Sequence, residues 1–409
     1  MRVLVEKKPA LLILNQMAGP MTWELAEDLG EAFGCVAMLT GHPDTLQKSH
    51  DKVLLFRAAP YRRSSLAHRV LSWLRYCAQA FFWLWRWAAD TPLLLFSNPP
   101  FLCWLGWLMR FLRRQRYAVM VHDVYPEAAV QVAGIPEGHA LIRFWRWLNR
   151  QAYERAEVVM TLSEGMAKNL EKQFDAARTR AGRIEVIPPW VDTQVIRPLP
   201  KEENPFAIQH GQAGKLTVLY SGNLGLGHDL GTMVEAARCL QDRRDIHFMV
   251  IGAGARWAEI EKAASELPNL TLLPYQPEEV LPFSLATADV AVISLDQGFE
   301  GVSMPSKTYY MMAAGAAILG LSRRPSDLQM IIEQHQCGIN LEPGDVDGFV
   351  EAISRFRADA GFLEACRRAA RRTAEEEFSR DVNVRRMLDV VAALLLRSNA
   401  AYEHEATMV

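Results

Sequence analysis

The chain has 409 residues, more than one hydrophobic core usually supports, so we expect two compact domains. Half of the residues are hydrophobic and the formal net charge is −2, which excludes a disordered chain and a wholly nucleic-acid-binding surface. The six cysteines lie far apart without paired short spacings, which argues against a zinc site or a disulfide framework and indicates buried free thiols.

The first domain is predicted to begin with a strand, a turn and a helix. The N-terminal residues lack a long apolar stretch followed by a small-residue cleavage site, so we expect no secretion signal and a reducing cytoplasm. Residues Pro9 to Leu14 form an apolar run typical of a buried strand. A turn-rich segment containing Gly19 and Pro20 separates this run from a helical pattern that starts at Trp23.

Five further short apolar runs follow in the first half of the chain, each separated from the next by a candidate helix. Fully apolar strands that alternate with helices are typical of a parallel sheet covered on both faces, so we expect a Rossmann-like domain. The runs are Val53–Phe56, Leu93–Phe96, Ala118–Val121, Val158–Thr161 and Ile184–Ile187.

The span from Arg57 to Arg116 is strongly basic and rich in tryptophan. It carries ten arginines, no lysine and one acidic residue, Asp90, and it holds six of the eleven tryptophans. Arginine and tryptophan together suit a bilayer interface, where the ring lies among headgroups and the cation meets anionic lipid. We therefore expect contact with an anionic membrane surface.

This span has three other interpretations. Arg86, Asp90 and Pro92 interrupt the longest apolar stretch, which argues against a bilayer-spanning helix and favours surface helices at 66–88 and 102–113. A single tryptophan is more often part of a domain core, so the aromatic residues could instead form the core of the first domain. Nucleic acid is disfavoured because the basic residues flank apolar runs.

A proline-rich and polar stretch from 188 to 214 is the best linker in the chain. It predicts a first domain at 1–198 and a second at 199–380, followed by a helix and tail at 381–409. The second domain repeats the apolar runs, so we expect two doubly wound α/β domains that face a cleft. Its runs are Lys215–Tyr220, His247–Ile251, Leu270–Leu273, Val290–Ile293 and Ala317–Gly320, and an amphipathic stripe from Val384 to Leu395 marks the last helix, which could pack back on the first domain.

Two segments after strands of the second domain could bind a phosphate. Gly222, Gly225 and Gly227 would let the backbone turn tightly before a helix, and His228 could add a donor, although glycine also serves such turns for steric reasons alone. Further on, Ser306 is a candidate N-cap and Lys307 falls in the first helical turn. A cation is unfavourable there, so either a bound diphosphate offsets its cost or the side chain points into solvent.

These segments resemble a known enzyme family. The run Pro305-Ser-Lys-Thr-Tyr-Tyr-Met-Met-Ala-Ala-Gly, with Ser221-Gly-Asn-Leu-Gly, is similar to the retaining GT-B glycosyltransferases of family 4, and within them to the WbuB-like and colanic-acid-type enzymes of bacterial surface polysaccharide synthesis. In the first half, Phe96-Ser-Asn-Pro-Pro-Phe, Val121-His-Asp-Val-Tyr-Pro-Glu, Thr161-Leu-Ser-Glu-Gly-Met and Val186-Ile-Pro-Pro-Trp-Val-Asp follow in the family's order. The resemblance covers nearly the whole chain.

The resemblance implies a role for particular residues. It places His122 beside the transferred sugar, where it would hydrogen-bond a hydroxyl or share developing charge, and it makes His122, Glu300 and Lys307 the candidate catalytic residues. Asn223 and His228 stand where many relatives have arginine and lysine, and Tyr310 stands near the place of a second, ribose-binding glutamate. The implied donor-binding residues are Gly222, Asn223, Gly225, His228, Gly252, Tyr275, Ser303, Met304, Pro305, Ser306 and Tyr310, and the implied acceptor-side residues are Gly19 and Asp123.

The same resemblance implies the reaction. We expect transfer from a nucleotide diphosphate sugar, with uridine diphosphate as the carrier and an N-acetylated sugar as one candidate, to a polyprenyl-diphosphate-linked glycan. Transfer would retain the anomeric configuration without a metal or cofactor, at the inner face of the bacterial cytoplasmic membrane. Two other classes stay open: a catalytically silent relative that scaffolds a polysaccharide assembly complex, and, ranked last, a dinucleotide oxidoreductase, for which the glycine fingerprint is missing.

Overall fold

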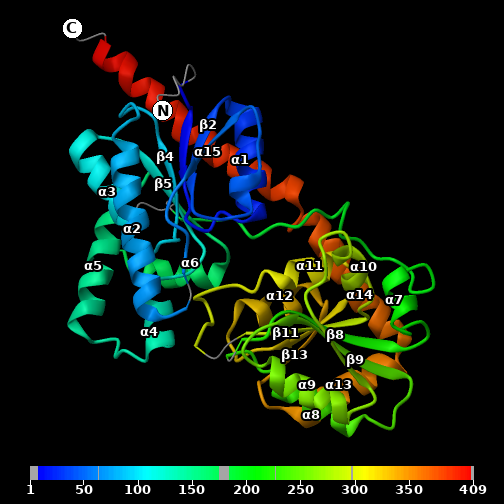
Figure 1. The fold of residues 1–409 in the computed structure, drawn as a ribbon. Coiled ribbons are helices and arrows are strands. Elements are labelled where there is room, and N and C mark those ends of the chain that lie inside the picture. Colours follow the sequence, from blue (N-terminus) through cyan, green and yellow to red (C-terminus); the bar gives the residue numbers. More distant parts are fainter. Residues whose placement is uncertain (1–7, 63, 175–183, 226, 296–297, 407–409) are drawn as a thin grey trace. The chain divides into compact units, whose positions relative to one another are not determined.

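The computed structural model describes residues 8–62, 64–174, 184–225, 227–295 and 298–406, and it divides into two compact units (Figure 1). Unit 1 extends to Pro188 and resumes at Val384, and unit 2 comprises Pro189–Asn383. Residues 189–198 therefore belong to unit 2. The prediction of two doubly wound α/β domains is confirmed, because each unit is built on one parallel sheet with helices between its strands.

The sheet of unit 1 has the strand order β3-β2-β1-β4-β5-β6-β7. All predicted runs form strands, and β2 is an additional one whose residues are as apolar as the others. In this sheet β1 pairs with both β2 and β4, so the strand order reverses at β1. The strands are β1 (Leu11–Leu14), β2 (Val36–Thr40), β3 (Val53–Arg57), β4 (Leu93–Phe96), β5 (Tyr117–Val121), β6 (Val159–Thr161) and β7 (Ile184–Val186).

The helices of unit 1 include three that lie together over one face of the sheet. α3 packs along α5, and α2 lies beside α3 (Figure 1). The long last helix, α15, contributes Val384, Met387, Val391 and Leu394 as buried residues, and from Val384 onward it clusters with unit 1. The helices are α1 (Pro20–Phe33), α2 (Leu66–Leu84), α3 (Leu102–Arg113), α4 (Glu127–Ala133), α5 (Ala140–Arg155), α6 (Glu164–Glu171) and α15 (Arg380–Ala406), with a 3-10 turn at Thr45–Gln47.

The sheet of unit 2 has the order β10-β9-β8-β11-β12-β13, and again all predicted runs form strands. β13 was not predicted, because its four residues are only half-buried and include Asn340. The strands are β8 (Leu216–Asn223), β9 (Ile246–Ala253), β10 (Leu270–Leu273), β11 (Val290–Ser294), β12 (Ala317–Leu321) and β13 (Gly338–Leu341). The helices are α7 (Pro205–Gln209), α8 (Gly231–Cys239), α9 (Trp257–Glu266), α10 (Leu281–Ala286), α11 (Lys307–Ala313), α12 (Asp327–His335), α13 (Val346–Ala358) and α14 (Ala360–Glu376).

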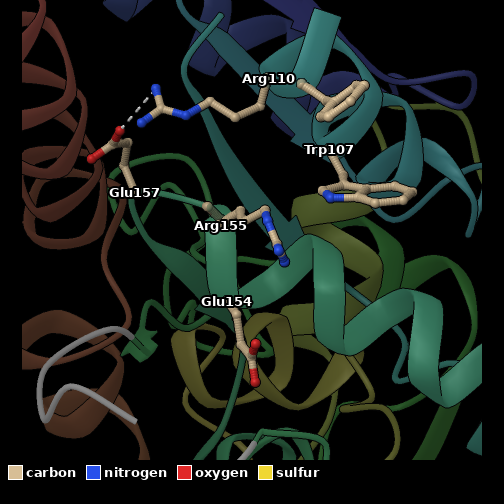
Figure 2. Close-up of a pocket in the computed structure, with 7 residues that line it drawn as sticks. Trp107, Arg110, Glu154, Arg155 and Glu157 are labelled. Carbon is tan, nitrogen blue, oxygen red and sulfur yellow. Dashed lines mark ion pairs between the residues drawn. The ribbon is translucent and has the colours of Figure 1, made fainter. Parts of the chain in front are cut away.

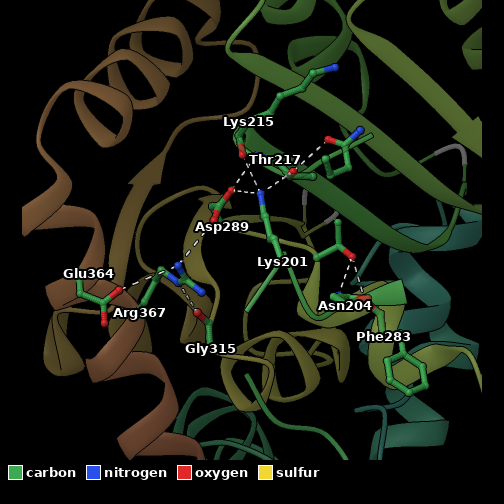
Figure 3. A network of polar contacts seen from close by, with 11 residues as sticks. Lys201, Asn204, Lys215, Thr217, Phe283, Asp289, Gly315, Glu364 and Arg367 are labelled. Atoms are coloured by element: carbon green, nitrogen blue, oxygen red, sulfur yellow. Dashed lines mark hydrogen bonds and ion pairs between the residues drawn. The ribbon is translucent and has the colours of Figure 1, made fainter. Parts of the chain in front are cut away.

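The predicted linker is fixed to unit 2 by a buried ionic network, which Figure 3 shows. The Lys201 ammonium pairs with Asp289 and donates to Thr217 Oγ1 at 2.7 Å. Asp289 Oδ2 also accepts from the backbone N–H of Thr217 at 2.8 Å, and Arg367 lies 3.6 Å from Asp289 Oδ1. Because Thr217 and Asp289 lie at the amino ends of β8 and β11, the linker covers that edge and leaves the carboxyl ends for a ligand.

The cysteine prediction is confirmed for the bonding state and only partly for burial. All six cysteines lie outside any disulfide; Cys103, Cys337 and Cys366 are buried, whereas Cys239 is exposed. Burial raises the pKa of the Cys103 and Cys337 thiols to about 12, so these two act as small apolar core residues.

Candidate functional site

The glycines at the ends of β8 and β9 serve two different purposes. Gly222 and Gly252 are register partners, and a Cβ atom on Gly252 would lie 1.9 Å from the carbonyl oxygen of Gly222. Close packing of the two strands therefore accounts for Gly252. Gly222 has a φ of +148°, a backbone conformation that residues with a side chain rarely adopt, and Lys307 Nζ lies in ordinary contact at 3.6 Å from its Cβ position. The backbone conformation therefore accounts for Gly222, and Lys307 lies directly beside it.

Lys307 is the first residue of α11 and reaches the end of β8. Its Nζ donates to Tyr220 Oη at 2.7 Å and lies 4.0 Å from the centre of that ring. The Tyr220 hydroxyl in turn donates to the carbonyl oxygen of Asn223 at 2.7 Å. The two predicted phosphate-binding segments therefore meet, and the interpretation of Lys307 as a solvent-pointing lysine is wrong. Tyr220 was missed, although a tyrosine directly before Ser221-Gly-Asn is a signal that could have found it.

The loop after β8 holds His228 beside Gly225. A Cβ atom on Gly225 would lie 3.3 Å from the His228 ring and 3.0 Å from Asn223 Nδ2, so a side chain there would crowd both. The carbonyl of His228 accepts from Arg256 Nη1 at 2.6 Å, and the backbone N–H of Asp229 donates to Ser294 Oγ at 2.8 Å. These contacts hold the loop directly before α8. The loop thus brings Asn223 and His228 close to Gly225. Residue 226 is not among the residues that the structure describes.

Glu300 lies in the segment before α11, and a backbone N–H of that same segment holds its side chain. Glu300 Oε2 accepts from the backbone N–H of Gly298 at 2.7 Å, whereas its Oε1 is buried and has no hydrogen-bond partner among the described residues. An unpaired buried carboxylate oxygen costs about 1–3 kcal/mol or more, so a donor from a ligand would be favourable there. Ser306 is the N-cap of α11, as predicted, but its side chain makes no capping hydrogen bond.

The remaining donor-side residues are distributed around these two segments. Met304 is buried, Ser303, Pro305 and Tyr310 are half-buried, and Tyr310 lies one turn after Lys307 on α11. Tyr275 is 55% exposed and follows β10, which β9 separates from β8 in the sheet. The structure therefore groups Gly222, Asn223, Gly225, His228 and Lys307 around the end of β8, and it places Tyr275 on the loop of a more distant strand.

In unit 1, His122 and Asp123 follow β5 and lie beside the loop after β4. The backbone N–H groups of His122 and Asp123 point to Ser97 Oγ at 2.9 and 3.4 Å, and the His122 ring lies edge-on to Phe96 at 5.3 Å between centroids. Burial lowers the pKa of His122 to about 4 and raises the pKa of Asp123 to about 6. His122 is therefore neutral at pH 7, which suits a hydrogen bond to a hydroxyl better than a cationic role.

Gly19 is the N-cap of α1 and borders the same edge of the sheet. The backbone N–H of Gln16 donates to the carbonyl oxygen of Asn98 at 2.8 Å, which joins the loop after β1 to the loop after β4. A Cβ atom on Gly19 would meet nothing within 4 Å, and its φ of −76° is open to any residue. Among the described residues, nothing in the packing of unit 1 requires glycine there.

A separate pocket of about 580 Å³ lies at the opposite edge of the sheet of unit 1 (Figure 2). Trp107, Arg110 and Phe111 of α3 line one side of it, and the end of α5 with Glu157 lines the other. Glu157 pairs with Arg110 at 3.7 Å and with Arg116 at 3.1 Å. The pocket lies at the amino ends of β5 and β6, so it is distinct from the edge that carries His122.

One side of unit 1 exposes an unusual number of large apolar side chains. We call it the α2–α3–α5 face; its exposed residues are Leu66, Leu71, Leu74, Phe82, Trp85, Leu108, Phe111, Leu112, Leu141, Phe144 and Trp147. Trp73 and Trp83 of α2 are buried, so the core interpretation holds for these two tryptophans and not for Trp85. α2 ends at Leu84, earlier than predicted. No helix in the described part of the chain has the length and apolarity that crossing a bilayer requires.

Two family models match the chain, one in each unit. Residues 18–190 match a glycosyl transferase 4-like domain, and residues 215–359 match the glycosyl transferases of group 1. Within the described residues, no three His, Cys, Asp or Glu side chains gather in a group that could hold a metal ion.

Relatives with similar sequences carry related names. The chain is 26% identical over 251 residues to a probable glycosyltransferase, WbjE, of Pseudomonas aeruginosa, covering 61% of this chain and 62% of that protein. It is 28% identical over 166 residues to a putative colanic acid biosynthesis glycosyl transferase, WcaI, of Escherichia coli K12, covering 40% of each. The matched region thus spans less than two thirds of either relative.

Solved structures share the fold across nearly the whole chain. Sucrose-phosphate synthase of Thermosynechococcus elongatus aligns with a TM-score of 0.74 and 17% identity, covering 96% of this chain and all of that one. HepE of Anabaena, in complex with UDP, aligns with a TM-score of 0.71 and 14% identity over 95% of this chain and all of that one. WaaG, a glycosyltransferase involved in lipopolysaccharide biosynthesis, aligns with a TM-score of 0.67 and 14% identity, covering 93% and 99%.

Proposed function

We propose that this chain, which belongs to the two-domain GT-B glycosyltransferases with a family 4-like and a group 1 domain, transfers a sugar from a nucleotide diphosphate sugar to a polyprenyl-diphosphate-linked glycan during synthesis of a bacterial surface polysaccharide. The observation that carries the proposal is the position of Lys307. Its ammonium group is held over Gly222 at the carboxyl end of β8, where parallel sheets bind their ligands.

The donor diphosphate is assigned to the loop after β8. Lys307 supplies a positive charge there, and the half-buried His228 supplies a ring nitrogen. Glu300 has an unpaired Oε1 that could accept a hydrogen bond from a sugar hydroxyl. Uridine diphosphate is the proposed carrier, a choice supported by the complex of the similarly folded HepE with UDP.

The proposed chemistry retains the anomeric configuration and uses no metal or cofactor. The bond from the anomeric carbon to the diphosphate oxygen breaks, and the acceptor oxygen bonds to the same face of that carbon. The acceptor proton passes to the leaving phosphate oxygen. Lys307 and His228 stabilise the charge that develops on the diphosphate, because preorganised donors act most strongly where charge forms. His122, neutral at pH 7, is proposed to hydrogen-bond a hydroxyl of the transferred sugar.

The acceptor is assigned to unit 1 and to a membrane surface. The exposed leucine, phenylalanine and tryptophan side chains of the α2–α3–α5 face would enter the interfacial region of a bilayer. The arginines of the 57–116 span would meet anionic headgroups. We therefore place the protein peripherally on the inner face of the bacterial cytoplasmic membrane, where polyprenyl-linked glycans are accessible to a cytoplasmic donor.

A thermal-shift screen with a panel of nucleotide sugars tests the donor assignment. A donor at 100 times its Kd stabilises the fold by about 2.7 kcal/mol, which raises the melting temperature, and Lys307→Ala should reduce this shift. Transfer of labelled sugar to a polyprenyl-diphosphate glycan then tests the reaction. A protein that no nucleotide sugar stabilises, and that transfers none, would instead be a silent scaffold.

A further inference from the structure

Six aromatic side chains form a continuous cluster in unit 1, beside the loop that carries His122. Trp73 stacks on Tyr61 at 6.1 Å and meets Tyr125 edge-on at 6.3 Å, and Tyr125 stacks on Trp145 at 5.8 Å. The aromatic cluster consists of Tyr61, Trp73, Phe101, Trp104, Tyr125 and Trp145. Tyr125 lies three residues after His122, so the cluster borders the carboxyl edge of the sheet.

Arg69 is a cation of α2, the helix that carries Trp73 of this cluster. It precedes Trp73 by one helical turn, so the two side chains share a face of the helix. Its Nε is buried and has no hydrogen-bond partner among the described residues. Burial raises the pKa of Tyr125, and the charges of Asp123 and Tyr61 add to this, whereas Arg69 opposes it. The Arg69 guanidinium thus favours the ionised form of the Tyr125 hydroxyl.

Exposed apolar side chains lead from the α2–α3–α5 face to the aromatic cluster. Leu66 is 66% exposed and lies one turn before Arg69 on α2, and Leu141 is 57% exposed and lies one turn before Trp145 on α5. An amphipathic ligand could thus keep its apolar part in contact with the face while its charged end meets Arg69. Neither a free anion nor a pure hydrocarbon would use both features.

We infer that Arg69 and the aromatic cluster bind the phosphate end of a prenyl-diphosphate lipid, with Arg69 on a phosphate and the half-buried rings of Tyr61, Tyr125 and Trp145 along the first isoprene units, while buried Trp73 supports them from below. The inference rests on the proposed function, since it names the group that holds the acceptor. A guanidinium in an aromatic, water-poor surrounding makes strong charge-assisted hydrogen bonds to phosphate, and its delocalised charge tolerates that surrounding. The rings supply apolar area with little loss of side-chain entropy.

Isothermal titration calorimetry with farnesyl diphosphate tests the site in the full chain. We expect saturable binding that Arg69→Gln weakens at least about tenfold, the equivalent of losing one charge-assisted hydrogen bond. Arg75→Gln is the matched control, because Arg75 lies on the same helix and is exposed; it should stay within about twofold of the wild type. Equal affinities of the Arg69→Gln and Arg75→Gln proteins would overturn the inference.

Three further ligands separate the contribution of Arg69 to binding from that of the aromatic cluster. Inorganic diphosphate should bind much more weakly than farnesyl diphosphate, and equal binding would remove the aromatic cluster from the site. Farnesol should also bind weakly, and equal binding would remove Arg69. Dihexanoyl phosphatidylglycerol carries a phosphate on a different lipid, and competition as strong as that of farnesyl diphosphate would show a general headgroup site and overturn the prenyl assignment.

Two controls keep the outcome independent of folding and of the proposed function. The Arg69→Gln protein should melt within a few degrees of the wild type and keep its shift with a nucleotide sugar, because Arg69 belongs to unit 1 and the donor is assigned to unit 2. Tyr61→Ala is a second variant that should also weaken farnesyl diphosphate binding. Prenyl binding without any sugar transfer would refute the proposed function alone, whereas transfer by Arg69→Gln with an unchanged KM for the acceptor would refute this site alone.

Discussion

The ammonium nitrogen of Lys307 lies 2.7 Å from the hydroxyl oxygen of Tyr220, and that hydroxyl donates to the carbonyl of Asn223. This chain of hydrogen bonds joins the first turn of α11 to the end of β8. The lysine at the start of a helix is therefore partly stabilised within the protein, by the tyrosine oxygen and by the face of its ring. A donor diphosphate would find the ammonium already positioned, so little ordering would be needed on binding.

Lys307→Ala should lower turnover far more than stability. Removing one preorganised donor to a developing oxyanion typically costs about 10²–10³ in kcat, so we expect a loss of that size. The free energy of unfolding should change by about 1 kcal/mol or less, because the half-buried side chain leaves behind a tyrosine hydroxyl that can still donate to Asn223. Steady-state transfer kinetics and urea denaturation of the same protein check both parts. An unchanged kcat would remove Lys307 from the mechanism.

Tyr220→Phe should reveal whether the tyrosine only positions the lysine. The ring and its packing stay, but the acceptor for Lys307 and the donor to Asn223 are lost. We expect a fall in kcat of about five- to tenfold, the equivalent of about 1 kcal/mol, and no further loss when the change is added to Lys307→Ala. If the two changes multiplied independently in the double variant, Tyr220 would act by some other route.

The fold was largely predictable because the signals that define it are local. Each buried strand is a short apolar run, and the predicted runs of both units form strands. The apolar residues of β2 gave an equally clear signal that was overlooked, whereas half-buried β13 gives none. The ends of helices were less predictable: α2 stops at Leu84, although the sequence pattern predicted a helix to Ala88.

The candidate site was predictable only in part, because contacts between distant segments leave no local pattern. Gly222 and Lys307 could each be chosen from sequence, but their contact across 85 positions depends on the pairing of β8 with β11. Tyr220 was overlooked although it directly precedes Ser221-Gly-Asn, and Arg69 was not chosen because one arginine among ten has no distinguishing local pattern. Gly252 was predicted to bind the donor only because of the family resemblance. The close packing of β8 and β9 alone explains why this residue is a glycine.

Lys201→Met should destabilise unit 2 without affecting donor binding. Burial lowers the pKa of Lys201, although Asp289 opposes this effect, and the change leaves the buried Asp289 carboxylate with Arg367 and one N–H group. Breaking a buried pair typically costs about 3–5 kcal/mol, and we expect about 3 kcal/mol here because these contacts remain. Urea denaturation measures it, with exposed Lys262→Met as the control. Because the network lies at the amino ends of the strands, a changed donor Kd would contradict this account.

Phe82→Ser with Phe144→Ser should release the protein from anionic vesicles. Both rings are more than half exposed, and each ring withdrawn from an interface loses about 1.5–3 kcal/mol, so the partition coefficient should fall more than tenfold. Co-sedimentation with vesicles containing phosphatidylglycerol measures it. Ile208→Ser, at an exposed apolar position of unit 2, is the matched control and should have no effect. Binding that survived the double change would assign the membrane contact to another surface.

The pH dependence of transfer should report on Asp123. Its pKa is raised by burial to about 6, so the carboxylate forms as the pH rises through 6, and an ionised Asp123 can accept a hydrogen bond from the acceptor hydroxyl. We expect kcat/KM to rise through this range in the wild type and the rise to disappear in Asp123→Asn. His122, with a pKa of about 4, stays neutral throughout. The same rise in Asp123→Asn would assign it to another group.

The stability of Asp123→Asn relative to the wild type should depend on pH in a direction that the raised pKa fixes. The folded state binds the proton with a pKa of about 6 and the unfolded chain with the ordinary value of 3.8. The ionised carboxylate therefore destabilises the fold above pH 6, and acidification removes this penalty progressively between about 6 and 3.8. Asparagine carries no such penalty, so its advantage should be largest at pH 7 and smaller at pH 5. Urea denaturation of both proteins at the two pH values measures the difference between their free energies of unfolding. Both proteins contain His122, so its opposing contribution cancels to first order. An advantage that grew on acidification would mean that Asp123 is ionised in the fold at pH 5 and that its surroundings stabilise the charge.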